Sequence, residues 1–144
     1  MVGMPRLGAD REQGMTLLEM LVAMVIMVMV GALAFPALEN AIAALSFRRS
    51  VDLVESDLRY ARAAAISRQR PIFIILSRDG HAYGAGGGPS RQAPAGIAYA
   101  ATPAEIGFFP DGSSSGGTFI VLGGGQRRQL VIDPVTGSIA SGAQ

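Results

Sequence analysis

The stretch Gly14-Met15-Thr16-Leu17-Leu18-Glu19 begins an apolar run that continues to Phe35 and decides how the chain is organised. The run consists almost entirely of Leu, Val, Met, Ile and Ala. About 20 helical residues, at a rise of ~1.5 Å each, span the ~30 Å hydrocarbon core of a bilayer. Glu19 lies inside the run, and a charge there costs roughly 2.5–3.5 kcal/mol at the helix centre and less near an end. We therefore expect a membrane-spanning helix and a group that compensates Glu19.

The segment before the run is short and polar, with Arg6 and Arg11 as its cations. The run is longer than the roughly 7–15 residues of a signal-peptide core, and no A-x-A-like cleavage site follows it. An uncleaved anchor and cleavage before the run are both compatible with this pattern. Short basic leaders stay in the cytoplasm, which places Met1 inside and the chain after Phe35 outside.

Composition limits the chemistry that the chain can perform. The formal net charge of +1 gives no reason to expect nucleic acid as the main partner. Cysteine is absent, and His81 is the only histidine, which leaves little material for a metal site. About 100 residues follow the run, enough for one modest hydrophobic core.

A second helical segment is expected from residue 37 to 69. Gly31 and Pro36 interrupt the pattern before it, so we expect a kink or local melting there. Apolar residues then recur at alternating spacings of three and four, which places them on one helix face. These residues are Ala44, Phe47, Val51, Val54, Leu58, Ala61 and Ala65. The stripe covers about three heptads and contains several alanines, which favours packing against the chain's own sheet over a coiled coil, and the basic residues are interpreted as a solvated face.

The pattern changes to short β-prone runs after Pro71. Arg78-Asp79-Gly80 predicts a hairpin turn, and residues 84–96, rich in Gly, Pro and Ser, predict a mobile surface loop. Strands are expected at 72–76, 81–83, 97–100, 106–109, 118–122, 129–132 and 138–140. Because no helix separates these runs, they are expected to pair antiparallel. The predicted fold is α+β, a long N-terminal helix whose second half packs on an antiparallel sheet.

Two stretches could be mistaken for sites. The glycine-rich residues 111–117 lack the Lys and the following helix of a phosphate loop, and Asp111 alone cannot form a Ca²⁺ loop. We expect an exposed connection whose glycines adopt unusual backbone angles. A hydrolytic triad could draw on residues 113–115, His81 and Asp79 or Asp111, but nothing resembles a nucleophile elbow. No catalytic, cofactor-binding or metal-binding residues and no enzymatic activity are therefore expected.

The opening stretch resembles the prepilin cleavage motif of type IV pilins and type II secretion pseudopilins. The resemblance implies that prepilin peptidase cuts after Gly14 and N-methylates Met15, which becomes the first residue. Glu19 would then be the acidic residue five positions into the mature chain. The family most often has Phe at the position of Met15, a mild departure because the side chain stays large and apolar.

A physical argument gives Glu19 a role beside this resemblance. Cleavage would create an ammonium at Met15 on the positive end of a helix dipole, which is unfavourable. A carboxylate within ~4 Å would gain on the order of 4 kcal/mol at an effective dielectric of about 20. Glu19 could pair with its own terminus or with that of a neighbouring subunit, which would assist assembly. The alternative is a Glu19 side chain that extends to the lipid headgroups.

A second resemblance lies near the C-terminus. The stretch 109–117, Phe-Pro-Asp-Gly-Ser-Ser-Ser-Gly-Gly, together with Ile132-Asp133 and Thr136-Gly137, is similar to the C-terminal pattern of the GspH/FimT family of minor pseudopilins and pilins. The resemblance implies a long N-terminal helix on a β-sandwich-like head and no enzymatic activity.

Together these patterns predict a minor pseudopilin of a type II secretion system in the bacterial inner membrane, with its N-terminus cytoplasmic and its head periplasmic. The implied partners are prepilin peptidase, major and minor pseudopilins, membrane lipid before assembly and secreted exoproteins. A minor type IV pilin of the FimT sort, with Arg127 and Arg128 as a basic cluster, is the alternative. An envelope enzyme with an uncleaved anchor is a third hypothesis.

The expected parts of the chain are a leader (1–14), a transmembrane and filament-core helix (15–36), its amphipathic continuation (37–70) and a β-rich head (71–144).

Overall fold

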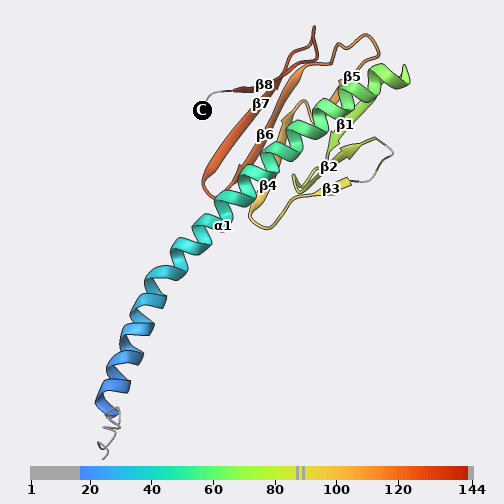
Figure 1. The fold of residues 1–144 in the computed structure, drawn as a ribbon. Helices are drawn as coiled ribbons and strands as arrows, with labels where there is room; N and C mark the ends of the chain where they lie inside the picture. Colours follow the sequence, from blue (N-terminus) through green and yellow to red (C-terminus); the bar gives the residue numbers. More distant parts are fainter. Residues whose placement is uncertain (1–16, 87, 89, 143–144) are drawn as a thin grey trace, which may run out of the picture. The chain divides into compact units, whose positions relative to one another are not determined.

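The computed structural model describes residues 17–86, 88 and 90–142. Within these residues one helix, α1 (Leu17–Arg68), precedes eight strands (Figure 1). The strands are β1 (Ile72–Leu76), β2 (Ala82–Ala85), β3 (Ser90–Gln92), β4 (Ile97–Thr102), β5 (Glu105–Phe108), β6 (Gly117–Gly123), β7 (Gln126–Ile132) and β8 (Ile139–Gly142). The chain divides into two compact units, Met1–Leu38 and Glu39–Gln144, which we describe separately.

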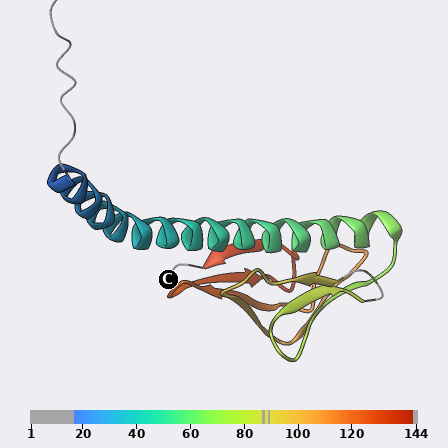
Figure 2. The ribbon, with the colours of Figure 1, turned by 90° about the horizontal axis from the view of Figure 1, so that it is seen from below.

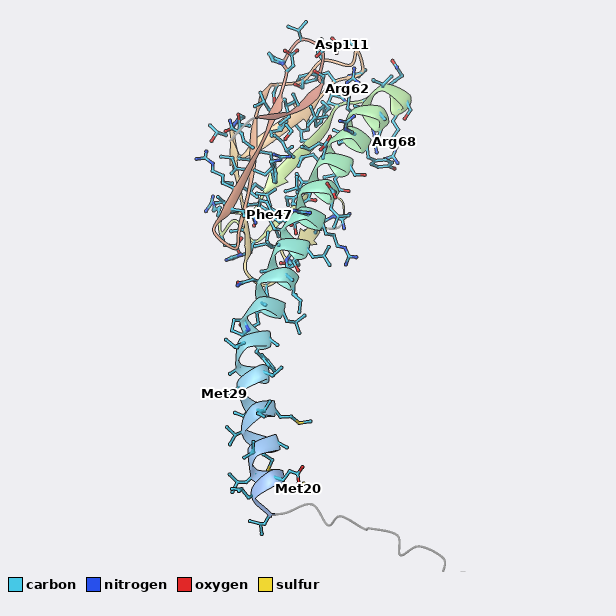
Figure 3. All side chains as sticks on the ribbon, turned by 60° about the vertical axis from the view of Figure 1, so that its left-hand side comes forward. Met20, Met29, Phe47, Arg62, Arg68 and Asp111 are labelled. Carbon is cyan, nitrogen blue, oxygen red and sulfur yellow. The ribbon has the colours of Figure 1, made fainter. Side chains whose placement is uncertain are left out.

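The described part of the first unit is the apolar beginning of α1. Its 18-residue window of highest mean hydropathy reaches 2.6, and none of that window is buried. Met20 and Met29 project outward from this part of the helix (Figure 3). A core helix of a soluble protein would be mostly covered, whereas this helix is long and apolar enough to cross a membrane. The predicted melting near Pro36 is wrong, because α1 continues through Pro36. The proline removes one backbone hydrogen bond from a helix that continues on both sides of it.

In the second unit, which we call the head, the predicted apolar face of α1 is buried. Phe47, Val51, Val54, Leu58, Ala61 and Ala65 are all at most 8% exposed. Ala44 is only half-buried, and the structure adds Ser50 and Ala64 to the buried face. On the solvent side Arg59 Nη2 pairs with Glu55 Oε1 at 2.6 Å, as an i, i+4 pair of this kind predicts.

Two four-stranded sheets form the rest of the head. Their strand orders are β3-β2-β1-β5 and β4-β6-β7-β8, and every neighbouring pair is antiparallel. Both sheets lie on one side of the head part of α1 (Figure 2). Their buried side chains, among them Tyr83, Phe108, Phe119 and Leu130, share one core with the helix. The predicted α+β fold with antiparallel strands is therefore confirmed.

The predicted mobile loop at residues 84–96 is partly wrong. Strand β2 extends to Ala85, and β3 pairs with it so that Tyr83 lies opposite Arg91 and Gly84 opposite Ser90. Gly84 and Ser90 belong to a stretch with low intrinsic β-propensity. The pairing with β2 decides the structure of this stretch, and the local composition does not predict that pairing.

Candidate functional site

The predicted processing residues are only partly within the described chain. Gly14 and Met15 lie outside the described residues. Glu19 lies in the first turn of α1. A carboxylate in the first turn of a helix interacts favourably with the helix dipole.

The two C-terminal stretches that were singled out by resemblance form one interlocked structure. We call residues 109–117 the serine loop and residues 133–137 the aspartate turn. Ser114 N donates to Pro134 O at 3.0 Å, and Ser114 Oγ donates to Asp133 O at 2.9 Å. The same hydroxyl accepts a hydrogen bond from Gly116 N at 3.0 Å. One buried serine therefore holds its own loop and the turn together.

The expectation that the serine loop is an exposed connection is wrong in part. Gly112, Ser114 and Gly116 are buried, whereas Asp111 and Ser115 are exposed. The predicted unusual angles are present, with φ of 86° at Gly112 and 69° at Gly116. The loop is packed because it forms hydrogen bonds with the aspartate turn, where Asp133 is 19 residues from Ser114, and with the neighbouring Gly107 of β5.

Arg62 of α1 joins the helix to both stretches. Its Nε donates to Gly112 O at 3.1 Å, and a Cβ atom added to Gly137 would lie 3.0 Å from the same Nε. Figure 3 shows Arg62 and Asp111 at the same end of the head. The interpretation of the basic residues of this helix as a solvated face is therefore wrong for Arg62, which is half-buried. No signal in the sequence distinguishes Arg62 from its neighbours.

Two aspartates stabilise the turns through short-range hydrogen bonds. Asp111 Oδ1 accepts from Ser113 Oγ at 2.6 Å and from Ser113 N at 3.0 Å, and these bonds lower the pKa of Asp111. Asp133 Oδ1 accepts from Thr136 N at 2.7 Å, from Thr136 Oγ1 at 2.9 Å and from Val135 N at 3.0 Å. The bonds from Thr136 lower the pKa of Asp133 most. Both carboxylates act as turn-forming acceptors.

The geometry does not assemble a hydrolytic triad from the described residues. The hydroxyls of Ser113 and Ser114 donate to Asp111 and Asp133, and Ser115 Oγ accepts from Gly107 N at 3.0 Å. Among the described residues no hydrogen bond joins the His81 ring to any of these serines, and His81 N itself donates to Asp79 Oδ1. The described part of the chain also contains no group of three potential metal ligands.

A second network connects α1 with the sheet β3-β2-β1-β5. Tyr83 Oη donates to Asp57 Oδ2 at 2.7 Å, and Arg91 Nε donates to the same oxygen at 2.7 Å. Arg91 Nη2 donates to Asp57 Oδ1 at 3.1 Å, so the guanidinium makes a bidentate contact with the carboxylate. Burial first, and then the hydrogen bond to Asp57, raise the pKa of Tyr83. Sequence reasoning missed this network because it did not predict β3, which carries Arg91.

The Arg127–Arg128 pair does not form a single basic patch. Both residues lie in β7, where successive side chains point to opposite faces. Arg127 is exposed, whereas half-buried Arg128 lines a hollow of about 480 Å³ with Arg48 and the carboxylate of Asp52. Asp52 therefore lies on the same surface as Arg48 of α1 and Arg128 of β7, and that surface is not purely basic.

The serine loop and the aspartate turn both lie in the part of the chain that matches a known family. Residues 50–137, which include most of the head, match the family model described as type II transport protein GspH. This match covers more than half of the chain. The chain belongs to the GspH family. This is a family of structural pseudopilins and not a family of enzymes. Residues 10–35 also match the prokaryotic N-terminal methylation motif. The predicted family is thus confirmed.

Individual relatives agree with this assignment. The type II secretion system protein H of Xanthomonas campestris pv. campestris is 29% identical over 140 residues, which is 90% of this chain and 83% of that protein. Two crystal structures of the type IV minor pilin FimU of Pseudomonas aeruginosa PAO1 have TM-scores of 0.57 and 0.56, each at 21% identity. They cover 67% of this chain and 88% and 92% of FimU. At this identity the FimU structures establish a pilin-like fold.

The GspH-type head can be tested by substituting the glycine on which the interlocked stretches meet. Gly137 has φ of 63°, and an added Cβ would clash with Gly112 O. Gly125 has φ of 73° but open space around its Cβ position. Gly125→Ala should cost roughly 1–2 kcal/mol of backbone strain. Gly137→Ala should cost about 1–3 kcal/mol more, because it also overpacks. Urea unfolding of the detergent-solubilised chain measures both, and equal losses would contradict the packing role of Gly137.

The Tyr83 network predicts a loss of stability at alkaline pH. The twelve basic residues are all arginines and cysteine is absent, so tyrosines are the side chains that titrate near pH 10. Burial raises the pKa of Tyr83 above the ordinary tyrosine value of 10.0, so the unfolded chain loses the proton first. The stabilisation is complete below pH 10 and is lost as pH rises above it. Urea unfolding between pH 8 and 11 should show a steeper decline for the wild type than for Tyr83→Phe. Parallel curves would show that Tyr83 does not carry this dependence.

Proposed function

We propose that this protein is a minor pseudopilin of a type II secretion system. The observation that carries the proposal is a GspH-type head on a chain whose helix begins with an exposed apolar segment. The head has no assembled catalytic site among its described residues, and its polar side chains stabilise turns and join elements. Such a protein acts by assembly, through contacts made by its surfaces.

The apolar beginning of α1 would occupy two environments in succession. Before assembly it would span the inner membrane as a single anchor, with the leader in the cytoplasm and the head in the periplasm. Prepilin peptidase would cut after Gly14 and methylate Met15. The mature helix would then leave the lipid for the helical core of a short pseudopilus. In both environments the apolar side chains from Leu17 onward, exposed in the isolated chain, are covered by non-polar groups.

Glu19 would guide the second step. Its place in the first turn of α1 puts it four residues after the new terminus at Met15. A carboxylate at that distance can pair with the methylated ammonium of a neighbouring subunit, and the non-polar surroundings strengthen the attraction. The head would join other major and minor pseudopilins near the tip, where it would assist the movement of secreted exoproteins.

A minor type IV pilin is the second candidate, and the fold shared with FimU favours it. A role in DNA uptake would require a basic surface, and the separation of Arg127 from Arg128 on opposite faces of β7 provides little of one. A gel-shift assay of the detergent-solubilised chain at two salt concentrations distinguishes the roles, because phosphate contacts weaken steeply with salt. Absence of binding at low salt would exclude the DNA-uptake version.

Processing is tested by the mass of the protein extracted from membranes. We expect a chain that begins at methylated Met15 when prepilin peptidase is present. We expect the full-length chain when the peptidase is absent. A native mass that begins before Gly14 in the presence of the peptidase would contradict processing and would favour an uncleaved anchor.

The role of Glu19 is tested by comparing Glu19→Ala with Glu39→Ala. Glu39 is an exposed acidic residue on the same helix, beyond the apolar run. Glu19→Ala should remain in the membrane fraction but enter pseudopili at least about tenfold less, which corresponds to about 1.4 kcal/mol. Glu39→Ala should behave as the wild type. Unchanged incorporation of Glu19→Ala, measured by immunoblotting of sheared pseudopili, would exclude the pairing.

A further inference from the structure

Two adjoining hollows, of about 260 and 290 Å³, lie where the C-terminal part of α1 meets the sheet β3-β2-β1-β5, and they share Arg68, Ile72 and Ala85. We call them together the helix–sheet groove. All of its lining residues belong to the head, and Arg68 lies near the end of α1 (Figure 3).

The first hollow has an apolar floor. Its apolar side chains include Ala61 and Ala64 of α1, Ile72 and Ile74 of β1 and Ala85 of β2. Asp57 and Arg91 also line the hollow, and their charges are paired with each other at 2.7 Å. Small-molecule pockets usually measure about 300–1,000 Å³. The hollow is below that range and has room for one large apolar side chain.

The second hollow is cationic. Arg68 and Arg70 line it with Pro71, Phe73, Gly86 and Gly88, and no carboxylate is among its described lining residues. Within the described part of the chain the two ion pairs are Arg59–Glu55 and Arg91–Asp57, and neither involves Arg68 or Arg70. Both arginines are exposed, and each guanidinium can donate two hydrogen bonds to one carboxylate.

We propose that the helix–sheet groove binds a segment of a partner protein in which a large apolar side chain is followed directly by carboxylates. The apolar side chain fills the hollow over Ala61, Ala64 and Ala85, and the carboxylates bind Arg68 and Arg70. Charge complementarity decides this occupant, because an apolar slot with two adjacent cations matches an acidic peptide. Nucleic acid would leave the apolar floor uncovered and would need many more phosphate contacts. The inference holds for either a pseudopilin or a pilin.

Three peptides test the chemistry of the groove. The probe is acetyl-Gly-Ser-Phe-Glu-Glu-Ser-Gly-amide with a neutral fluorophore, compared with one peptide that has Gln for both Glu and another that has Ser for Phe. Fluorescence anisotropy with the full chain in uncharged detergent measures binding at about 50 mM salt, where screening is weak. The Phe-Glu-Glu peptide should bind about tenfold or more tightly than either control, and its affinity should fall as salt increases.

Variants of the chain test the location. Arg68→Gln with Arg70→Gln should weaken binding about tenfold, whereas Arg49→Gln with Arg127→Gln, which removes two exposed cations elsewhere, should not. Ala85→Leu should block the floor, whereas Ala140→Leu, at an exposed strand position outside the groove, should leave binding intact. Thermal unfolding of each variant confirms that the head is folded.

Several outcomes would overturn the proposal. Equal binding of the Glu and Gln peptides would remove the role of the two arginines, and binding unaffected by Ala85→Leu would place the peptide elsewhere. Failure of all three peptides to bind at millimolar concentration would exclude this occupant. Self-association of the chain that is lost in the Arg68 and Arg70 variant, without peptide binding, would assign the groove to a second copy of this protein.

Discussion

The apolar face of α1 between Phe47 and Ala65 is the surface on which the head depends. Buried side chains of both sheets share a core with it, and Val54, Leu58 and Ala65 on it are completely inaccessible to water. Complete burial of a Val or Leu side chain adds roughly 1.5–3 kcal/mol to the free energy of unfolding. The packing of this face also positions the polar side chains beside it. Arg62 and Asp57 lie next to the apolar face, so its packing against the sheets brings them within hydrogen-bond distance of their partners.

These flanking contacts join the helix to the rest of the head. Arg62 binds the serine loop, and Asp57 binds Tyr83 and Arg91 of the sheet β3-β2-β1-β5. The loop and the aspartate turn in turn share the buried Ser114. The residues of these two stretches are therefore structural. They allow two stretches about 20 residues apart to close one end of the head with their polar groups paired.

The first unit differs from the head because its apolar side chains are exposed. Its side chains from Leu17 to Phe35 find no cover within the described chain, so lipid or other helices must provide it. The proposed minor pseudopilin would meet that need twice, first in the membrane and then in a filament core. In the head, the proposed partner surface is the helix–sheet groove, which has an apolar and a cationic part.

Features that depend on near neighbours in the chain can be predicted from the sequence. The apolar run, the face from Phe47 to Ala65 and the runs that became β1 and β6 follow from hydrophobic spacing and β-propensity, which act locally. The role of Arg62, the pairing of β3 with β2 and the burial of Ser114 follow only from the folded structure. Each depends on contacts with residues outside its own element or loop, and a solvated arginine and a half-buried one leave the same local pattern. The serine loop and the aspartate turn are identified in the sequence by resemblance, but only their hydrogen bonds in the structure explain what they do.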